Sequence, residues 1–189
     1  MDILEVDLKS FIEDEMSGYR VSVCANLPYY ITTPIIMSLL ESKADIEKIV
    51  VMIQKEVATR LTSSAGSAEY GAITPTVQYY SVVKKLFDVA PGNFMPRPDV
   101  TSTVISFEKR SKPIVNPNSE EVLFRTIRGA FALRRKTIVN SLSTEFTQFS
   151  KEEITNCLIK AGISPTCRGE TLDLKSLCEL SNEINKLLS

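Results

Sequence analysis

The segment that most constrains how this chain can fold is the junction around residues 26–29, where a hydrophobic stretch gives way to a loop and then to a helix. Residues 20–25 (Arg-Val-Ser-Val-Cys-Ala) alternate apolar with small or polar side chains, which predicts a short strand with a covered face. Thr33 and Pro34 then suit the N-cap and the first position of an apolar helix. The order strand, tight loop, helix predicts an open α/β sheet, in which such a loop borders the ligand-binding crevice.

The loop itself reads Asn26-Leu27-Pro28-Tyr29, and these residue types suit methyl transfer onto the exocyclic amine of a base. The Asn26 side-chain carbonyl and a neighbouring backbone carbonyl can accept the two N–H bonds of an adenine N6 amine, which directs its lone pair at a methyl donor. Pro28 fixes its own φ and adds no competing donor, and Tyr29 can stack on the base. The chain has no histidine, and this scheme needs no general base. A bare Asn-x-Pro-Tyr is also an ordinary turn, so the motif alone leaves both interpretations open.

Further segments follow this motif in a fixed order along the chain. They are residues 30–34 (Tyr-Ile-Thr-Thr-Pro), 54–57 (Gln-Lys-Glu-Val), 94–98 (Phe-Met-Pro-Arg-Pro), 134–137 (Arg-Arg-Lys-Thr) and 140–142 (Asn-Ser-Leu). Together they resemble the small-subunit ribosomal RNA adenine N6,N6-dimethyltransferases, from about Ile3 to the C-terminus. The resemblance implies an α/β fold with a Rossmann-like methyltransferase core, followed by a small all-helical domain. It also implies S-adenosyl-L-methionine as cofactor and dimethylation of two adjacent adenines near the 3′ end of small-subunit rRNA.

The same resemblance implies roles for particular residues. The catalytic set is Asn26, Leu27, Pro28, Tyr29 and Phe94, of which Phe94 packs on the target base, and the cofactor contacts are Asp7 and Asn26. The chain departs from the family at the cofactor site, because its seven glycines form no G-x-G. We therefore expect the N-terminal strands and the glycine-rich loop to be missing, with residues 3–7 forming the end of the third strand. Taken as an isolated residue, Asp7 reads as a surface charge or a helix cap.

Domain organisation follows from the proline-containing stretch 109–119, which predicts a boundary. We expect a partial methyltransferase catalytic domain over residues 1–112 and a helical, RNA-binding C-terminal domain over residues 113–189. Residues 97–140 carry nine basic and four acidic residues, whereas the whole chain has a net charge of −1. Such a local positive field attracts RNA phosphates, although a stripe of arginines is also typical of a solvated helix face. The candidate RNA-binding residues are Arg97, Arg125, Arg128, Arg134, Arg135 and Lys136.

Composition excludes some other classes of protein. No apolar run approaches the ~20 residues of a membrane-spanning helix, and the four cysteines show no C-x-x-C spacing, so we expect neither a membrane partner nor a metal. A cytoplasmic location and an immature small ribosomal subunit as partner are expected. Two alternatives remain open, a large-subunit rRNA adenine N6-methyltransferase of the macrolide-resistance type and a non-catalytic rRNA-binding assembly factor.

Overall fold

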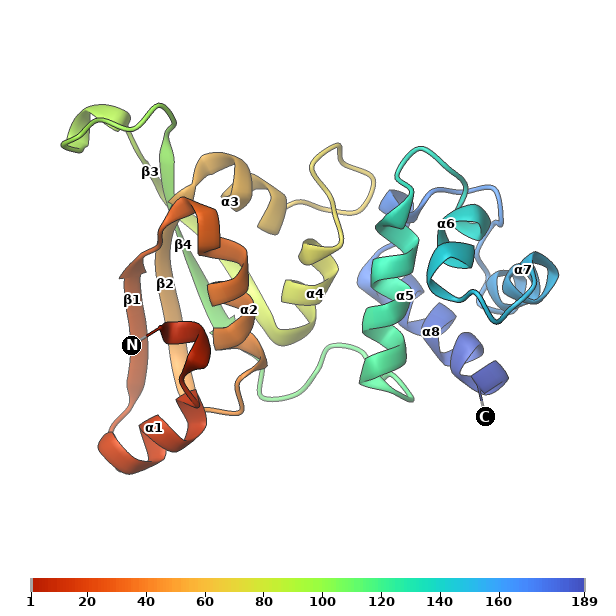
Figure 1. The fold of residues 1–189 in the computed structure, drawn as a ribbon, viewed down its shortest axis with the longest axis horizontal. Helices are drawn as coiled ribbons and strands as arrows, with labels where there is room; N and C mark the ends of the chain where they lie inside the picture. Colours follow the sequence, from red (N-terminus) through yellow and green to blue (C-terminus); the bar gives the residue numbers. More distant parts are fainter. Residues whose placement is uncertain (1, 189) are drawn as a thin grey trace. The chain divides into compact units, whose positions relative to one another are not determined.

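The computed structural model describes residues 2–188, and a four-stranded mixed sheet forms the core of the first part of the chain (Figure 1). The strands are β1 (Val21–Asn26), β2 (Ile46–Gln54), β3 (Ser81–Val89) and β4 (Ser102–Lys109). Their order across the sheet is β1-β2-β4-β3, with β1 parallel to β2 and both other pairs antiparallel. This matches the strand, loop, helix order expected around residue 26.

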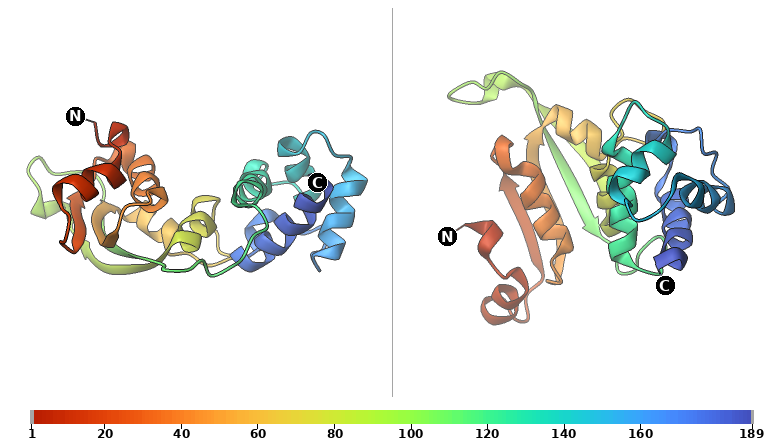
Figure 2. Two further views of the ribbon diagram at one scale, coloured as in Figure 1. Left: turned by 90° about the horizontal axis from the view of Figure 1, so that it is seen from below. Right: turned by 45° about the vertical axis from the view of Figure 1, so that its right-hand side comes forward.

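Helices cover one face of this sheet. They are α1 (Leu8–Glu15), α2 (Thr32–Glu41) and α3 (Lys55–Leu61), and Figure 2 shows them on the same side of the strands. Ile49, Val51 and Ile53 alternate along β2 and are at most 1% exposed, whereas Val50 and Met52 between them are only half-buried. Burial of the alternating set is the main stabilising contribution to this part of the chain.

The sheet topology brings two distant loops to one edge. Because β1 and β2 are parallel, their carboxyl ends at Asn26 and Gln54 lie at the same edge. Ser102, the first residue of the antiparallel strand β4, pairs with Gln54 and therefore lies there as well. The connection between β3 and β4 consequently emerges at this edge, and Figure 1 shows it extending beyond the strands.

The described residues divide into two compact units. The first contains residues 2–62 and 80–112, and the second contains residues 63–79 and 113–188. The second unit holds most of α4 (Ile73–Tyr80) with α5 (Glu120–Ala132), α6 (Ile138–Glu145), α7 (Lys151–Lys160) and α8 (Leu174–Leu188). Residues 63–79 thus differ from the expected division, which placed them in the methyltransferase domain.

Local contacts explain why residues 63–79 belong to the helical unit. The ring of Tyr70 is 1% exposed and lies 5.6 Å from the ring of Phe131, centroid to centroid. The backbone N–H of Gly66 donates to the carbonyl of Glu170 over 2.7 Å. One contact joins the buried Tyr70 ring to the half-buried Phe131 ring, and the other is a backbone hydrogen bond. Both span more than 50 residues of sequence, and no pattern in the sequence could have predicted them.

Within the helical unit, α5 packs against α6 and α8, and α7 packs against the same two helices. The centre of this packing is apolar and completely buried: Leu123, Leu142, Phe146, Leu158 and Leu177. Ser119 caps α5, and Ser150 forms a capping box with Glu153 at the start of α7. Gly162, with φ at +71°, follows the end of α7 as the sequence predicts.

The structure corrects three local expectations. Residues 3–5 form a 3₁₀ turn instead of the end of a strand, because the side chain of Asp2 accepts from the N–H of Leu4 and no neighbouring strand pairs with the segment within the described residues. The helix after the motif begins at Thr32 with Ile31 as N-cap, since the 3₁₀ turn Tyr29–Ile31 runs directly into it.

The third correction concerns the arginine stripe. Arg125, Arg128 and Arg135 have helical spacing in the sequence, but α5 ends at Ala132 and a turn separates it from α6. The N–H of Leu133 donates to the hydroxyl of Ser141, which closes this turn. Arg135 therefore lies outside the helix that carries the other two arginines.

Gly169 tests the packing of the helical unit. A Cβ at this position would overlap the carbonyl carbon and oxygen of Ala130 in α5. We expect Gly169→Ala to destabilise the unit by about 3 kcal/mol, at the upper end of the cost of overpacking. Urea unfolding followed by circular dichroism measures the change. Gly92→Ala is the matched control, because its Cβ would meet no atom within 4 Å; equal stability of the two variants would contradict the predicted close contact.

Candidate active site

The motif after β1 is fixed by its backbone and by one buried side chain. The N–H of Leu27 donates to the carbonyl of Met52 over 3.1 Å, and the Leu27 side chain is only 6% exposed. The carbonyl of Pro28 accepts two hydrogen bonds, from the N–H of Ile31 at 3.2 Å and from the hydroxyl of Thr32 at 3.0 Å. The peptide turn after Asn26 is therefore rigid, and Asn26 itself remains exposed at the end of its strand.

The connection between β3 and β4 supplies the opposite wall. Residues 91–93 form a 3₁₀ turn, and the N–H of Phe94 donates to the carbonyl of Pro91 over 3.3 Å. Phe94 is half-buried, while Arg97 and its neighbour Pro96 are exposed. Prolines on both sides of Phe94 restrict the backbone of the loop and so hold the ring at the edge of the sheet.

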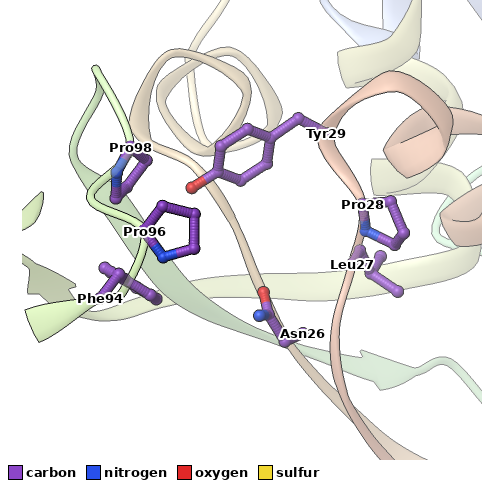
Figure 3. Close-up of a pocket in the computed structure, with 7 residues that line it drawn as sticks. All are labelled: Asn26, Leu27, Pro28, Tyr29, Phe94, Pro96 and Pro98. Carbon is purple, nitrogen blue, oxygen red and sulfur yellow. The ribbon is translucent and has the colours of Figure 1, made fainter.

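Both walls border one open pocket of about 280 Å³ (Figure 3). Its lining consists of Asn26, Leu27, Pro28, Tyr29, Phe94, Pro96 and Pro98. Figure 3 shows the Asn26 side chain directed into the space between Tyr29 on one side and Phe94 on the other. The five residues predicted as catalytic thus line a single apolar slot with one amide at its base. Such a slot can accept a flat aromatic molecule and hydrogen-bond to its polar edge.

Ser102 is a contact that sequence reasoning did not identify. The hydroxyl of Tyr29 lies 2.7 Å from the hydroxyl of Ser102, whose side chain is completely buried at the start of β4. This hydrogen bond joins the motif loop to the end of the Phe94 loop. The only feature of the sequence that pointed to Ser102 was its position shortly after Phe94. Buried serines are common in strands, so this feature does not identify a partner for Tyr29.

Asp88 forms an ionic cluster at the same edge. Its carboxylate lies 2.8 Å from the ammonium of Lys85, 2.7 Å from the hydroxyl of Thr103 and 3.0 Å from the ammonium of Lys55. These hydrogen bonds, from Lys85 first, then Thr103 and Lys55, hold the pKa of Asp88 well below its ordinary value of 3.8. The cluster ties the ends of β3 and β4 to the first residue of α3.

Asp7 lies apart from this pocket. Its carboxylate caps α1, because it accepts from the N–H groups of Lys9 and Ser10 and from the hydroxyl of Ser10, and these bonds lower its pKa. It borders a second hollow, which shares no lining residue with the Asn26 pocket. Asp7 and Asn26 therefore border different hollows of the described residues. The cofactor contacts predicted for these two residues remain predictions.

The predicted RNA-binding residues have different surroundings. Arg125 is half-buried: its Nε lies 3.2 Å from the Glu145 carboxylate, and its guanidinium lies 4.8 Å from the centre of the Phe146 ring. Arg128 shares the same carboxylate at 3.4 Å. In contrast, Arg134, Arg135 and Lys136 are exposed in the turn between α5 and α6, where Arg134 donates to the carbonyl of Ala68.

Residues 2–188 contain no group of three or more His, Cys, Asp or Glu side chains that could hold a metal ion. None of their helices is long and apolar enough to cross a membrane. The thiols of Cys157 and Cys178 are buried, and burial raises the pKa of both.

Comparison with known proteins identifies a family. A model of the family described as ribosomal RNA adenine dimethylase matches residues 1–186. A protein of Alkaliphilus metalliredigens (strain QYMF), named ribosomal RNA small subunit methyltransferase A, is 42% identical over 97% of this chain and 64% of its own length. A protein of the same name from Geobacillus thermodenitrificans (strain NG80-2) is 45% identical over 98% of this chain and 64% of its own length. The chain therefore spans slightly less than two thirds of the length of these curated relatives.

Two solved structures share the fold. A dimethyladenosine transferase from Plasmodium falciparum superposes with a TM-score of 0.74 and 23% identity, over 92% of this chain and 70% of that chain. The 23S rRNA methyltransferase ErmE superposes with a TM-score of 0.64 and 19% identity, over 97% of this chain and 70% of that chain. These likenesses confirm the predicted fold class, a Rossmann-like methyltransferase core with a helical domain.

Asp88 provides a pH test of the edge that carries the pocket. Because its folded-state pKa is depressed, the carboxylate stabilises the fold above its ordinary pKa of 3.8, and this contribution is lost as the pH falls towards the folded-state value. We expect Asp88→Asn to lower the urea midpoint at pH 7 and to approach the wild-type midpoint below about pH 4. Asp14→Asn, at an exposed site in α1, is the control. A difference between Asp88→Asn and wild type that stays constant from pH 7 to pH 3 would contradict the assignment.

Proposed function

The chain belongs to the ribosomal RNA adenine dimethylase family, and from that premise we propose that it acts in the S-adenosyl-L-methionine-dependent N6-dimethylation of two adjacent adenines near the 3′ end of small-subunit rRNA. The observation that carries the proposal is the single pocket that is lined by the Asn26 amide and by the rings of Tyr29 and Phe94. The proposed substrate is the immature small ribosomal subunit in the cytoplasm. The proposed activity is that of the whole protein in ribosome biogenesis.

Asn26 and a backbone carbonyl would orient the target amine. The side-chain carbonyl of Asn26 accepts one N6–H, and the second acceptor is the carbonyl of Leu27. The carbonyl of Pro28 is excluded because the N–H of Ile31 and the hydroxyl of Thr32 already occupy both of its lone pairs. With both N–H bonds held, the nitrogen becomes pyramidal and its lone pair points out of the plane of the ring.

Tyr29 and Phe94 would hold the two faces of the base. Extruding an adenine from its stack costs a few kcal/mol, and stacking on an aromatic side chain returns about 1–3 kcal/mol per base. The slot is mostly apolar and suits the apolar faces of the base, so transfer of a flipped base from water into the slot costs little free energy. The polar edge of the base then faces Asn26.

The methyl group comes from the cofactor, and the protein supplies orientation. S-adenosyl-L-methionine, when bound, carries an electrophilic methyl group on a sulfonium. Asn26 would hold the amine for attack on that methyl group, with S-adenosylhomocysteine as the leaving group and the surplus N6 proton released to water, so no general base is required. After the first transfer N6 has one remaining N–H, and one of the two acceptors then lacks a donor. The pocket is open enough to leave room for the first methyl group during the second transfer.

The exposed basic turn would bind rRNA phosphates. Arg134, Arg135 and Lys136 present three cations from one short segment of the helical unit, and Arg97 adds a cation next to Phe94. Arg125 has its charge compensated by Glu145 and its guanidinium stacked on Phe146, so we assign it to packing of the helical unit. Arg128 shares the Glu145 carboxylate and can contribute at most a partly neutralised charge.

Asn26→Ala tests the proposed chemistry. Removing the amide takes away an acceptor that orients the nucleophile, so we expect methyl transfer to fall by at least about 100-fold. The assay follows labelled methyl from S-adenosyl-L-methionine to unmethylated small ribosomal subunits. Asn156→Ala is the matched control, because it makes the same change at an exposed site on α7.

The outcomes of this assay separate the alternatives. Transfer to isolated large subunits in preference to small ones would replace the proposal with the macrolide-resistance type of activity. RNA binding that survives Asn26→Ala, with no transfer by the wild-type chain at saturating cofactor, would refute methyl transfer by this chain and favour the non-catalytic assembly factor.

The double substitution Arg134→Ala with Arg135→Ala tests the RNA surface. Each arginine that binds a phosphate releases a counterion from the RNA, and the alanine variant loses this release. We therefore expect weaker RNA binding. We also expect the slope of log affinity against log salt concentration to become smaller in magnitude by about 1–2. Lys160→Ala with Lys175→Ala removes two exposed cations elsewhere in the helical unit and should leave the slope unchanged. An unchanged slope in the arginine variant would contradict the assignment.

A further inference from the structure

The hydrogen bond between Tyr29 and Ser102 links the two walls of the pocket. The two hydroxyl oxygens are 2.7 Å apart, and Ser102 is 0% exposed. We propose that Ser102 is a positioning residue, which sets the direction of the Tyr29 ring axis so that the slot accepts a flat base. This inference rests on the proposed function, because it assigns a role within the same pocket.

The position of the serine oxygen is fixed by the sheet. Ser102 pairs with Gln54 of β2 on one side and with Val89 of β3 on the other, so its backbone is held by two strands. Thr103, the next residue, is completely buried and donates to Asp88 over 2.7 Å. The oxygen of Ser102 is therefore a rigid reference point at the end of the Phe94 loop.

The tyrosine needs such a reference point. Tyr29 opens the short 3₁₀ turn Tyr29–Ile31, outside the strand ladder, and its side chain is half-buried. The first side-chain torsion of a tyrosine has three staggered positions, and each one points the axis of the ring in a different direction. A hydrogen bond at the hydroxyl restrains the ring at the end farthest from the backbone. Figure 3 shows this hydroxyl directed towards the proline-containing wall of the pocket.

The two hydroxyls depend on each other. Within the described part of the chain, each has the other as its side-chain hydrogen-bond partner. Removing either hydroxyl breaks the same hydrogen bond and leaves the other hydroxyl without its partner and poorly solvated. Removing both hydroxyls leaves no unpaired hydroxyl behind. Tyr29→Phe keeps the whole aromatic ring and its stacking area. Any loss of base binding in that variant must therefore come from orientation of the ring.

The test is a double-mutant cycle on base binding. The probe is a short single-stranded RNA in which 2-aminopurine stands next to an adenine. The fluorescence of 2-aminopurine is quenched when this base stacks on an aromatic ring. We expect Tyr29→Phe and Ser102→Ala each to weaken the affinity measured by quenching about fivefold. The double variant should bind no more weakly than either single variant. Ser106→Ala, a buried serine on the same strand, should bind as the wild type does.

Several results would overturn the inference. The first is that Ser102→Ala binds the probe with wild-type affinity. The second is that the fold-losses of affinity in the two single variants multiply in the double variant. The third is that Ser106→Ala loses as much affinity as Ser102→Ala. All measurements are made at a temperature at which circular dichroism shows every variant to be folded, so that a general loss of stability does not mimic the effect.

A second measurement separates this inference from the proposed function. If the wild-type chain does not quench the probe, base binding in this pocket is refuted, and the hydrogen bond is then read directly by NMR. A hydrogen-bonded Tyr29 hydroxyl proton exchanges slowly, which splits the ring carbon signal next to the oxygen in mixed H2O and D2O. The splitting should disappear in Ser102→Ala and be kept in Ser106→Ala. Its persistence in Ser102→Ala would overturn the positioning role.

Discussion

The antiparallel insertion of β4 between β2 and β3 is the constraint on which the site depends. Parallel strands β1 and β2 place Asn26 at one edge of the sheet, and the reversed direction of β4 places Ser102 at that same edge. The loop before Ser102 begins and ends at this edge, and three of its residues line the pocket at the end of β1: Phe94, Pro96 and Pro98. Residues nearly 70 positions apart in the chain, Asn26 and Phe94, therefore line one pocket because of strand direction and not because of any local attraction.

Polar contacts turn this arrangement into a rigid slot. Asp88 binds Lys55, Lys85 and Thr103, so the two ends of the Phe94 loop and the start of α3 cannot move independently. The hydrogen bond between the hydroxyls of Tyr29 and Ser102 adds a link across the slot itself. A site that is already ordered costs little reorganisation when a ligand binds, and the proposed base site would have this advantage.

The basic residues of the helical unit fall into two groups, one that packs within the unit and one that is exposed, and the local structure decides to which group each residue belongs. Arg125 is compensated by Glu145 and stacked on Phe146, so it holds α5 against α6. The arginines at 134 and 135 come only a few residues later, but the end of α5 turns them into an exposed segment. Positive charge in one sequence block thus performs two different roles, and burial decides which role each residue has.

The sequence by itself determined the strand, loop and helix around Asn26, the capping box at Ser150 and the family, because these depend on residues close together in the chain or on motifs in a fixed order. Only the tertiary structure decided the rest. Asp7 caps α1 with its side chain, and residues 3–5 form a turn in place of a strand. Residues 63–79 join the helical unit through Tyr70 and Gly66, and Ser102 becomes the partner of Tyr29 through strand pairing. Contacts of this kind join residues far apart in sequence, and no local periodicity records which partner a buried hydroxyl or ring will meet.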